Sequence, residues 1–154
     1  MPEIPCVKNF RTVFAVAAVA AFFAAAAGAE PSWSTDYKRS QQEAKANHKL
    51  LLLNFTGSDW CGWCIRLQHE VFSKPEFADY AAKNLVLVEL DFPSRKQLSD
   101  TIRQQNGEMA QQYQIQGFPT IIVLNGDGQK VGELGYIPGG PSAFIAELEK
   151  LRKG

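Results

Sequence analysis

The sequence contains few of the residues on which disulfide-stapled, metal-binding or nucleic-acid-binding proteins depend. Its 154 residues include three cysteines and two histidines, and 16 basic side chains balance 16 acidic ones. Three cysteines cannot hold a disulfide-rich scaffold together, so the core has to form by burial of apolar side chains. Without an excess of basic residues there is no basic face, which argues against nucleic acid as a partner. The length fits one domain.

Cofactor and metal signatures are lacking as well. The chain has no Gly-x-Gly-x-x-Gly run of the kind that binds flavin or nicotinamide nucleotides. A structural zinc site needs four ligands, and beyond the cysteines only His48 and His69 are available, at no familiar spacing. A c-type haem site needs histidine directly after a Cys-x-x-Cys pair, where this chain has Ile65. We therefore predict no cofactor and no metal.

The first 29 residues differ in composition from the rest. Lys8 and Arg11 give a basic start, residues 12–27 form an almost wholly apolar run, and residues 27–29 are small. This order is typical of a secretory signal peptide. The alternative is an uncleaved membrane anchor, but the run is shorter than the roughly 20 residues of a membrane-spanning helix.

We accordingly predict a signal peptide at residues 1–29 and one domain at residues 30–154, located in the periplasm or secreted. Cys6 precedes the expected cleavage site, so the mature chain keeps Cys61 and Cys64 alone. Disulfides form and persist outside the cytoplasm. A single Cys-x-x-Cys pair in that setting is either a small structural loop or a redox centre.

Apolar periodicity in residues 30–154 predicts alternating helices and strands. The run 85–91 is apolar enough for a strand buried on both faces. Asn-Gly and Asp-Gly at residues 125–128 predict a hairpin turn. The result is an α/β fold, a small mixed four-stranded sheet with helices on both faces, in which the first two strands are parallel and the last two antiparallel. We expect strands at 50–55, 85–91, 118–124 and 130–136, and helices at 34–49, from 62, at 75–83, 96–105, before 113, and at 142–153.

The position of the cysteine pair predicts redox chemistry. Cys61 falls between a buried strand with its turn and the start of a helix, where unpaired backbone N–H groups and the helix dipole favour a thiolate. Cys64 lies one turn further on, close enough to attack a mixed disulfide. The alternative is an inert structural disulfide, but so short a loop stabilises little. The pair can therefore cycle between dithiol and disulfide.

Four features of the sequence occur together: the strand at 50–55, the run Trp60-Cys61-Gly62-Trp63-Cys64, the segment Gly117-Phe118-Pro119-Thr120, and a hairpin with Gly126 and Gly128 before the closing helix. With these features the chain resembles proteins of the thioredoxin fold from about Ser34 to Arg152. The run 55–61 and the segment 91–93 are most similar to a group of exported bacterial thioredoxin-like proteins.

The resemblance implies roles for individual residues. Cys61 would be the attacking thiol and Cys64 the resolving thiol. Phe118 and Pro119 would shape the substrate groove, with the Phe118–Pro119 bond cis; the alternative is an ordinary trans proline at a strand start. Trp60 would lie beside Cys61 and form part of the same binding surface.

Trp63 departs from the proline that ordinary thioredoxins carry between their cysteines. Its large apolar face either binds substrate or packs only against the helix. Many family members also have a buried acid in the strand before the cysteines, and the matching residue here is Asn54. Asparagine cannot accept a proton at neutral pH. Water, Glu89 or Asp59 would have to take its place, and the sequence does not choose among them.

These inferences predict a monomeric thiol–disulfide oxidoreductase that reduces or rearranges disulfides in exported cysteine-containing proteins. Its electrons would come from a partner, with a membrane thiol relay as the natural donor. Two rivals remain open: a disulfide-forming oxidase, and a non-enzymatic module that uses the fold to hold client proteins.

Overall fold

The computed structural model describes residues 30–154; the predicted signal peptide and Cys6 lie outside the described residues. A five-stranded mixed sheet has the strand order β1-β3-β2-β4-β5. Its strands are β1 (Trp33–Ser34), β2 (Leu50–Thr56), β3 (Leu85–Asp91), β4 (Thr120–Leu124) and β5 (Lys130–Leu134). The helices are α1 (Tyr37–Asn47), α2 (Gly62–Leu67), α3 (Pro75–Asn84), α4 (Asp100–Gln112) and α5 (Gly140–Lys153), with a π-helical turn, η1, at Gln68–Phe72.

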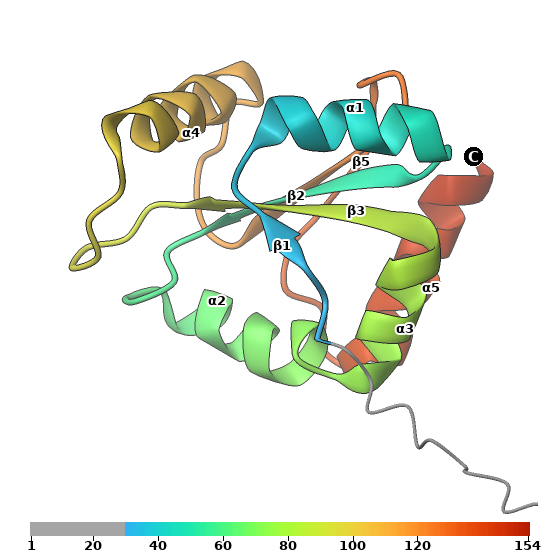
Figure 1. Ribbon diagram of the computed structural model, residues 1–154. Helices are drawn as coiled ribbons and strands as arrows, with labels where there is room; N and C mark the ends of the chain where they lie inside the picture. Colours follow the sequence, from blue (N-terminus) through green and yellow to red (C-terminus); the bar gives the residue numbers. More distant parts are fainter. Residues whose placement is uncertain (1–29) are drawn as a thin grey trace, which may run out of the picture.

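Helices cover both faces of the sheet (Figure 1). α1 and α4 pack on one face, and α2, α3 and α5 pack on the other. Successive residues of β2 alternate between the two layers, so that Leu52 belongs to the α2–α3–α5 side and Leu53 to the α1–α4 side. Because both layers are apolar, β2 and β3 are buried on both faces. This confirms the prediction for residues 85–91.

The pairing of the strands decides what meets at the ends of the sheet. β2 and β3 run parallel over their whole length, from Leu50 opposite Leu85 to Thr56 opposite Asp91. Their carboxyl ends therefore lie side by side, next to the turn that leads to the cysteines. β4 and β5 form the predicted antiparallel hairpin. Its turn uses Gly128 at φ +84°, a conformation that glycine adopts without a steric penalty.

Three expectations were wrong in detail. The sheet has five strands rather than four, because the two residues of β1 pair in parallel with Leu87 and Val88 of β3. The first helix begins at Tyr37 after an Asp36 cap, not at residue 34. The two helices expected between residues 96 and 113 are the single helix α4, capped by Ser99. Within residues 30–154, no helix has the length and apolar character needed to cross a membrane.

Candidate active site

Cys61 and Cys64 form a disulfide at the start of α2. Cys61 is the N-cap of this helix, and its Sγ accepts a hydrogen bond of 3.2 Å from the backbone N–H of Cys64. Both residues are buried, with 7% and 4% of their surface exposed. In the reduced protein the same N–H, together with the positive end of the helix dipole, favours negative charge on the Cys61 sulfur. This contact distinguishes Cys61 from Cys64, which lies one turn inside the helix.

A buried carboxylate holds the turn before the cysteines. Asp91, the last residue of β3, accepts hydrogen bonds from the backbone N–H of Ser58 at 3.0 Å and from its hydroxyl at 2.6 Å. The Lys96 ammonium lies 3.7 Å from the same carboxylate. Within the turn, the Cys61 N–H donates to the Gly57 carbonyl at 2.9 Å. Asp91 therefore fixes the backbone that leads directly into Cys61.

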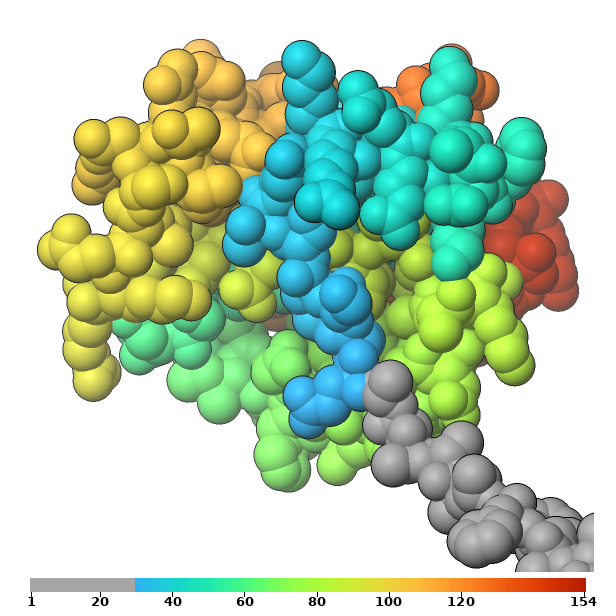
Figure 2. All heavy atoms as spheres, in the orientation of Figure 1, coloured from blue at the N-terminus to red at the C-terminus, as the bar shows by residue number. Residues whose placement is uncertain are grey.

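A second carboxylate joins this turn to the segment between β3 and α4. The carboxylate of Asp59 accepts hydrogen bonds from the backbone N–H groups of Ser94 and Arg95, at 2.8 and 2.7 Å, and a longer one from Lys96. These bonds hold the pKa of Asp59 below its ordinary value. The yellow segment at the left of Figure 2 is this connection, and it lies against the green active-site region. Asp59 is committed to the backbone and is not free to serve Cys64.

Trp60 lies over the active-site turn and is half exposed. Its indole N–H donates to the carbonyl of Phe92 at 2.8 Å, and its ring meets Phe118 edge to face at a centroid distance of 5.9 Å. The rings of Phe92 and Phe118 stack at 5.1 Å. A Cβ at residue 57 would lie 2.5 Å from the indole, so the ring keeps this position only because residue 57 is glycine.

Pro119 directly precedes β4, and the Phe118–Pro119 peptide bond is cis. The next residue, Thr120, pairs with Phe55 of β2. Phe118 and Pro119 are half-buried. The structure thus brings Phe118 to Trp60, on the side of the turn that faces the β3–α4 connection.

Trp63 belongs to a separate cluster of side chains, with Tyr136 and Arg66. It is 55% exposed, and its ring is 5.1 Å from that of Tyr136. The Arg66 guanidinium stands over both rings and pairs with Glu70 at 2.8 Å. A hydrogen bond from the Tyr136 hydroxyl, assisted by Arg66, lowers the pKa of Glu70. Trp63 therefore both packs on neighbouring residues and leaves an apolar face open to solvent.

A cavity of about 320 Å³, large enough for several water molecules, opens beside Cys64. Cys64 lines it together with Asn54 of β2 and Glu89 of β3. The Asn54 side chain is buried, and its Oδ1 has no hydrogen-bond partner among residues 30–154. Burial raises the pKa of the half-buried Glu89 carboxyl.

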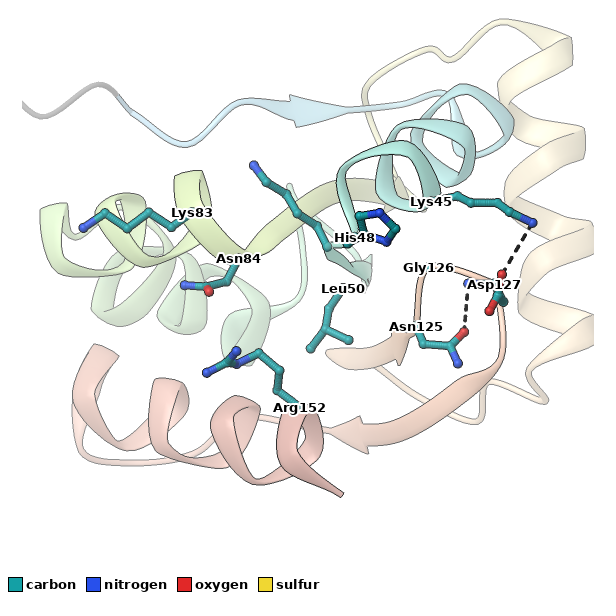
Figure 3. A pocket seen from close by; sticks show the side chains of 10 residues that line it. Lys45, His48, Leu50, Lys83, Asn84, Asn125, Gly126, Asp127 and Arg152 are labelled. Carbon is teal, nitrogen blue, oxygen red and sulfur yellow. Dashed lines mark hydrogen bonds and ion pairs between the residues drawn. The ribbon is translucent and has the colours of Figure 1, made fainter.

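A larger hollow, of about 540 Å³, lies at the opposite end of the sheet, beside the first residue of β2 (Figure 3). Three of its cations stand in the last turns of α1, α3 and α5: Lys45, Lys83 and Arg152. Lys45 pairs with Asp127, and Arg152 pairs with Glu149. Cations at helix carboxyl ends offset the helix dipole, which accounts for this basic surface. Among the described residues no cluster of three or more histidine, cysteine or acidic side chains could hold a metal ion.

Sequence reasoning assigned no role to the residues that support the site, although the segment 91–93 contributed to the resemblance. Asp91 holds the active-site turn through Ser58. The Phe92 carbonyl holds the indole of Trp60, and the ring of Tyr136 packs against Trp63. One signal was available for Asp91, because an acidic residue ends a strand that is expected to lie parallel to the strand before the cysteines. Nothing local in the sequence indicates the contact between Tyr136 and Trp63.

Comparisons with known proteins agree with this geometry. Residues 37–152 match the thioredoxin-like domain family. The chain is 35% identical over 127 residues to the disulfide bond reductase DsbH of Chlamydia pneumoniae, covering 82% of this chain and 76% of that protein. It is 31% identical over 103 residues to the thioredoxin-related protein DsbJ of the same organism, 67% of this chain but 30% of DsbJ.

A solved structure described as DsbH oxidoreductase superimposes with a TM-score of 0.78 at 35% identity, covering 82% of this chain and 88% of the other. The family match, the relatives and the Cys61–Cys64 pair lead to one assignment. The chain belongs to the thioredoxin-like family and is a thiol–disulfide oxidoreductase.

Proposed function

We propose that the protein works as a reductase for disulfides in exported proteins, with Cys61 as the nucleophile and Cys64 as the resolving thiol. The observation that carries the assignment of roles is the hydrogen bond from the Cys64 N–H to the Cys61 Sγ at the N-cap of α2. A donor aimed at this sulfur stabilises its thiolate. Cys64 lies one turn inside the helix, and among residues 30–154 no hydrogen bond to its sulfur matches the one that Cys61 accepts.

The proposed reaction proceeds in two exchanges. The Cys61 thiolate attacks one sulfur of the substrate disulfide, forms a mixed disulfide with it and releases the other sulfur as a thiolate, which takes up a proton. Cys64 loses its proton and attacks the Cys61 sulfur. The substrate then leaves as its second thiolate, and Cys61 and Cys64 end as a disulfide. Two electrons have passed from the cysteine pair to the substrate.

Trp60, Phe118 and Pro119 form the proposed substrate surface on one side of Cys61, and the open face of Trp63 extends it. Trp60 and Trp63 are both about half exposed, although large apolar side chains are usually buried. An apolar surface beside a reactive sulfur suits unfolded or extended chains, whose apolar side chains are accessible.

Reductive turnover requires that the cysteine pair be reduced again. The similarity to a protein named disulfide bond reductase favours this direction, and the two Dsb relatives suggest a thiol relay. We propose a membrane thiol relay as the electron donor and a monomer located in the periplasm or secreted, released from a signal peptide at residues 1–29. Exported proteins with cysteines are the proposed substrates, because disulfides persist outside the cytoplasm.

Insulin reduction tests the function. The wild-type protein should accelerate the precipitation of insulin chains in the presence of dithiothreitol, and Cys61→Ser should be inactive. Cys64→Ser should instead accumulate a mixed disulfide with the substrate. Equal inactivity of the wild type and Cys61→Ser, with no mixed disulfide in Cys64→Ser, would favour the rival client-binding module.

The reduction potential separates a reductase from an oxidase. Equilibration with glutathione should give a value closer to about −270 mV, as in thioredoxin, than to about −120 mV, as in DsbA. A value near the upper figure would assign the chain to disulfide formation and contradict the proposed direction.

A further inference from the structure

The resolving step needs an acceptor for the proton of Cys64. This thiol is buried, with 4% of its surface exposed, and Asn54 in the strand before the cysteines cannot accept a proton. We propose that Glu89, on the neighbouring strand β3, is the general base that takes the proton of Cys64 during resolution. The inference rests on the proposed function for the roles of the two cysteines, and it adds a residue to that reaction.

The register of the sheet places Glu89 where an acid at residue 54 would act. Asn54 and Glu89 are direct partners in the parallel pair of β2 and β3, so their side chains project from the same face of the sheet. That face is the one covered by α2, which carries Cys64. All three residues line the same cavity of about 320 Å³. A carboxylate is therefore available one strand away from residue 54, in a cavity that Cys64 also lines.

Asn54 adds an amide side chain to the lining of this cavity. Its Oδ1 is buried and lacks a partner among the described residues, and a buried acceptor without a partner costs free energy unless water reaches it. The cavity is large enough to admit water. A water in this cavity would have Cys64 and Glu89 along the same lining. The proton can pass through such a water without direct contact between the two side chains.

The charges around Glu89 suit a base that must also release its proton. Burial raises the pKa of Glu89, nearby Asp91 raises it further, and Lys96 opposes both. A raised pKa brings a carboxylate closer to the pKa of a thiol, which makes proton transfer more favourable. His69 stands exposed at the rim of the same cavity.

The other acids near the site already accept hydrogen bonds from neighbouring groups. Both oxygens of Asp91 bind Ser58, and Asp91 lines a different pocket. The carboxylate of Asp59 binds the backbone of the β3–α4 connection. Among the described residues, Glu89 is the acid that shares a cavity with Cys64.

The step balances in protons and electrons. The Cys64 S–H bond breaks, and its proton goes to the Glu89 carboxylate through water. The Cys64 sulfur then bonds to the Cys61 sulfur while the bond between Cys61 and the substrate sulfur breaks, so the electron pair leaves with the substrate thiolate. Glu89 returns its proton to solvent through the open side of the cavity.

A two-phase experiment isolates this step. The reduced protein is mixed with dithiobis(nitrobenzoate): attack by Cys61 releases one thionitrobenzoate, and attack by Cys64 on the resulting mixed disulfide releases a second. Cys64→Ser, which lacks the second phase, identifies it. Glu89→Gln should leave the first phase unchanged and slow the second at least about tenfold at neutral pH, since a positioned general base contributes a factor of 10² to 10⁴.

The pH profile and two further variants decide between a base and a structural role. In Glu89→Gln the second phase should rise steadily with pH, because hydroxide must replace the carboxylate. The double variant Asn54→Asp/Glu89→Gln, which returns a carboxylate to the partner position, should restore the rate, and Glu108→Gln on the exposed face of α4 should match the wild type.

The proposal is overturned if Glu89→Gln keeps the wild-type second phase and pH profile, or if both phases slow equally. It is also overturned if His69→Gln, and not Glu89→Gln, slows the second phase. Failure of the insulin assay with a normal second phase would contradict the proposed function and leave this step standing, so the two results are distinguishable.

Discussion

At the scale of single residues, Asp91 is the side chain on which the active-site turn depends. It is buried and accepts both hydrogen bonds that Ser58 offers. Asp91→Ala would leave the Ser58 N–H without its acceptor, and hydrogen bonds to a charged group are worth about 1.5–3 kcal/mol each. We expect a loss of about 2–4 kcal/mol in the free energy of unfolding, measured by urea denaturation at neutral pH.

Asp127→Ala is the matched control for this prediction. Asp127 also pairs with a lysine, Lys45 at 3.4 Å, but both side chains are about 70% exposed. Exposed ion pairs contribute about 0–1 kcal/mol, so little change is expected. Equal losses in the two variants would show that Asp91 does not hold the turn.

The change of stability at acid pH tests the role of Asp59. Its pKa is lowered in the folded protein by hydrogen bonds from the backbone of Ser94 and Arg95, so the folded state favours the ionised form. The resulting stabilisation is present above the ordinary value of 3.8 and is lost as the pH falls through the lower folded-state pKa. Asp59→Asn should therefore be less stable than the wild type at pH 7, and the difference should shrink below pH 3.8.

Urea denaturation of both proteins at several pH values measures this difference. A stability difference that stays constant from neutral pH to below 3.8 would contradict the account of Asp59.

The residues of the candidate site could be predicted from the sequence to different degrees. Cys61 and Cys64 are three residues apart, so their placement at a helix start follows from local pattern alone. Glu89 could be named as a candidate but not chosen, because the choice depends on the register of β2 and β3. The hydrogen bond between Asp91 and Ser58 spans 33 residues, and no local pattern encodes such a distance.

At the scale of elements, β1 anchors the start of the described chain. Its Trp33 ring packs against Phe72 at a centroid distance of 5.0 Å, and its two residues extend the sheet beyond β3. Trp33→Ala should lower the free energy of unfolding by about 2 kcal/mol, less than a fully buried tryptophan because Trp33 is half-buried.

Ile65→Ala on the exposed face of α2 provides the comparison, with an expected change below about 0.5 kcal/mol. Urea denaturation measures both variants. If Trp33→Ala were as stable as Ile65→Ala, β1 would be only loosely associated with the sheet.

The elements that sequence reasoning missed leave no distinct pattern in the sequence. A two-residue strand such as β1 is too short for any periodicity to appear. The π-helical turn η1 continues α2 with the same apolar spacing, so the sequence does not distinguish the two. By contrast, β3 and the β4–β5 hairpin were predicted well, because a long apolar run and an Asn-Gly-Asp-Gly turn are strong local signals.

At the scale of the whole molecule, the domain division predicts processing. Expression of residues 1–154 in a bacterium with a general secretory pathway should yield a periplasmic protein that begins at Glu30. Intact-mass measurement of the periplasmic fraction checks this outcome. A membrane-bound product that retains Met1 would show that residues 1–29 are an anchor, the alternative that the short apolar run left open.

The two edges of the sheet also bear on whether a foreign strand can add to it. β1 is two residues long, and β5 carries Lys130 and Glu133, which pair with each other beside an irregular register at Leu124. Short, charged and irregular edges discourage the addition of a foreign strand, the first event in β-aggregation. With such edges the molecule would be able to exchange disulfides with the proposed substrates, unfolded exported chains, without seeding their assembly on its own sheet.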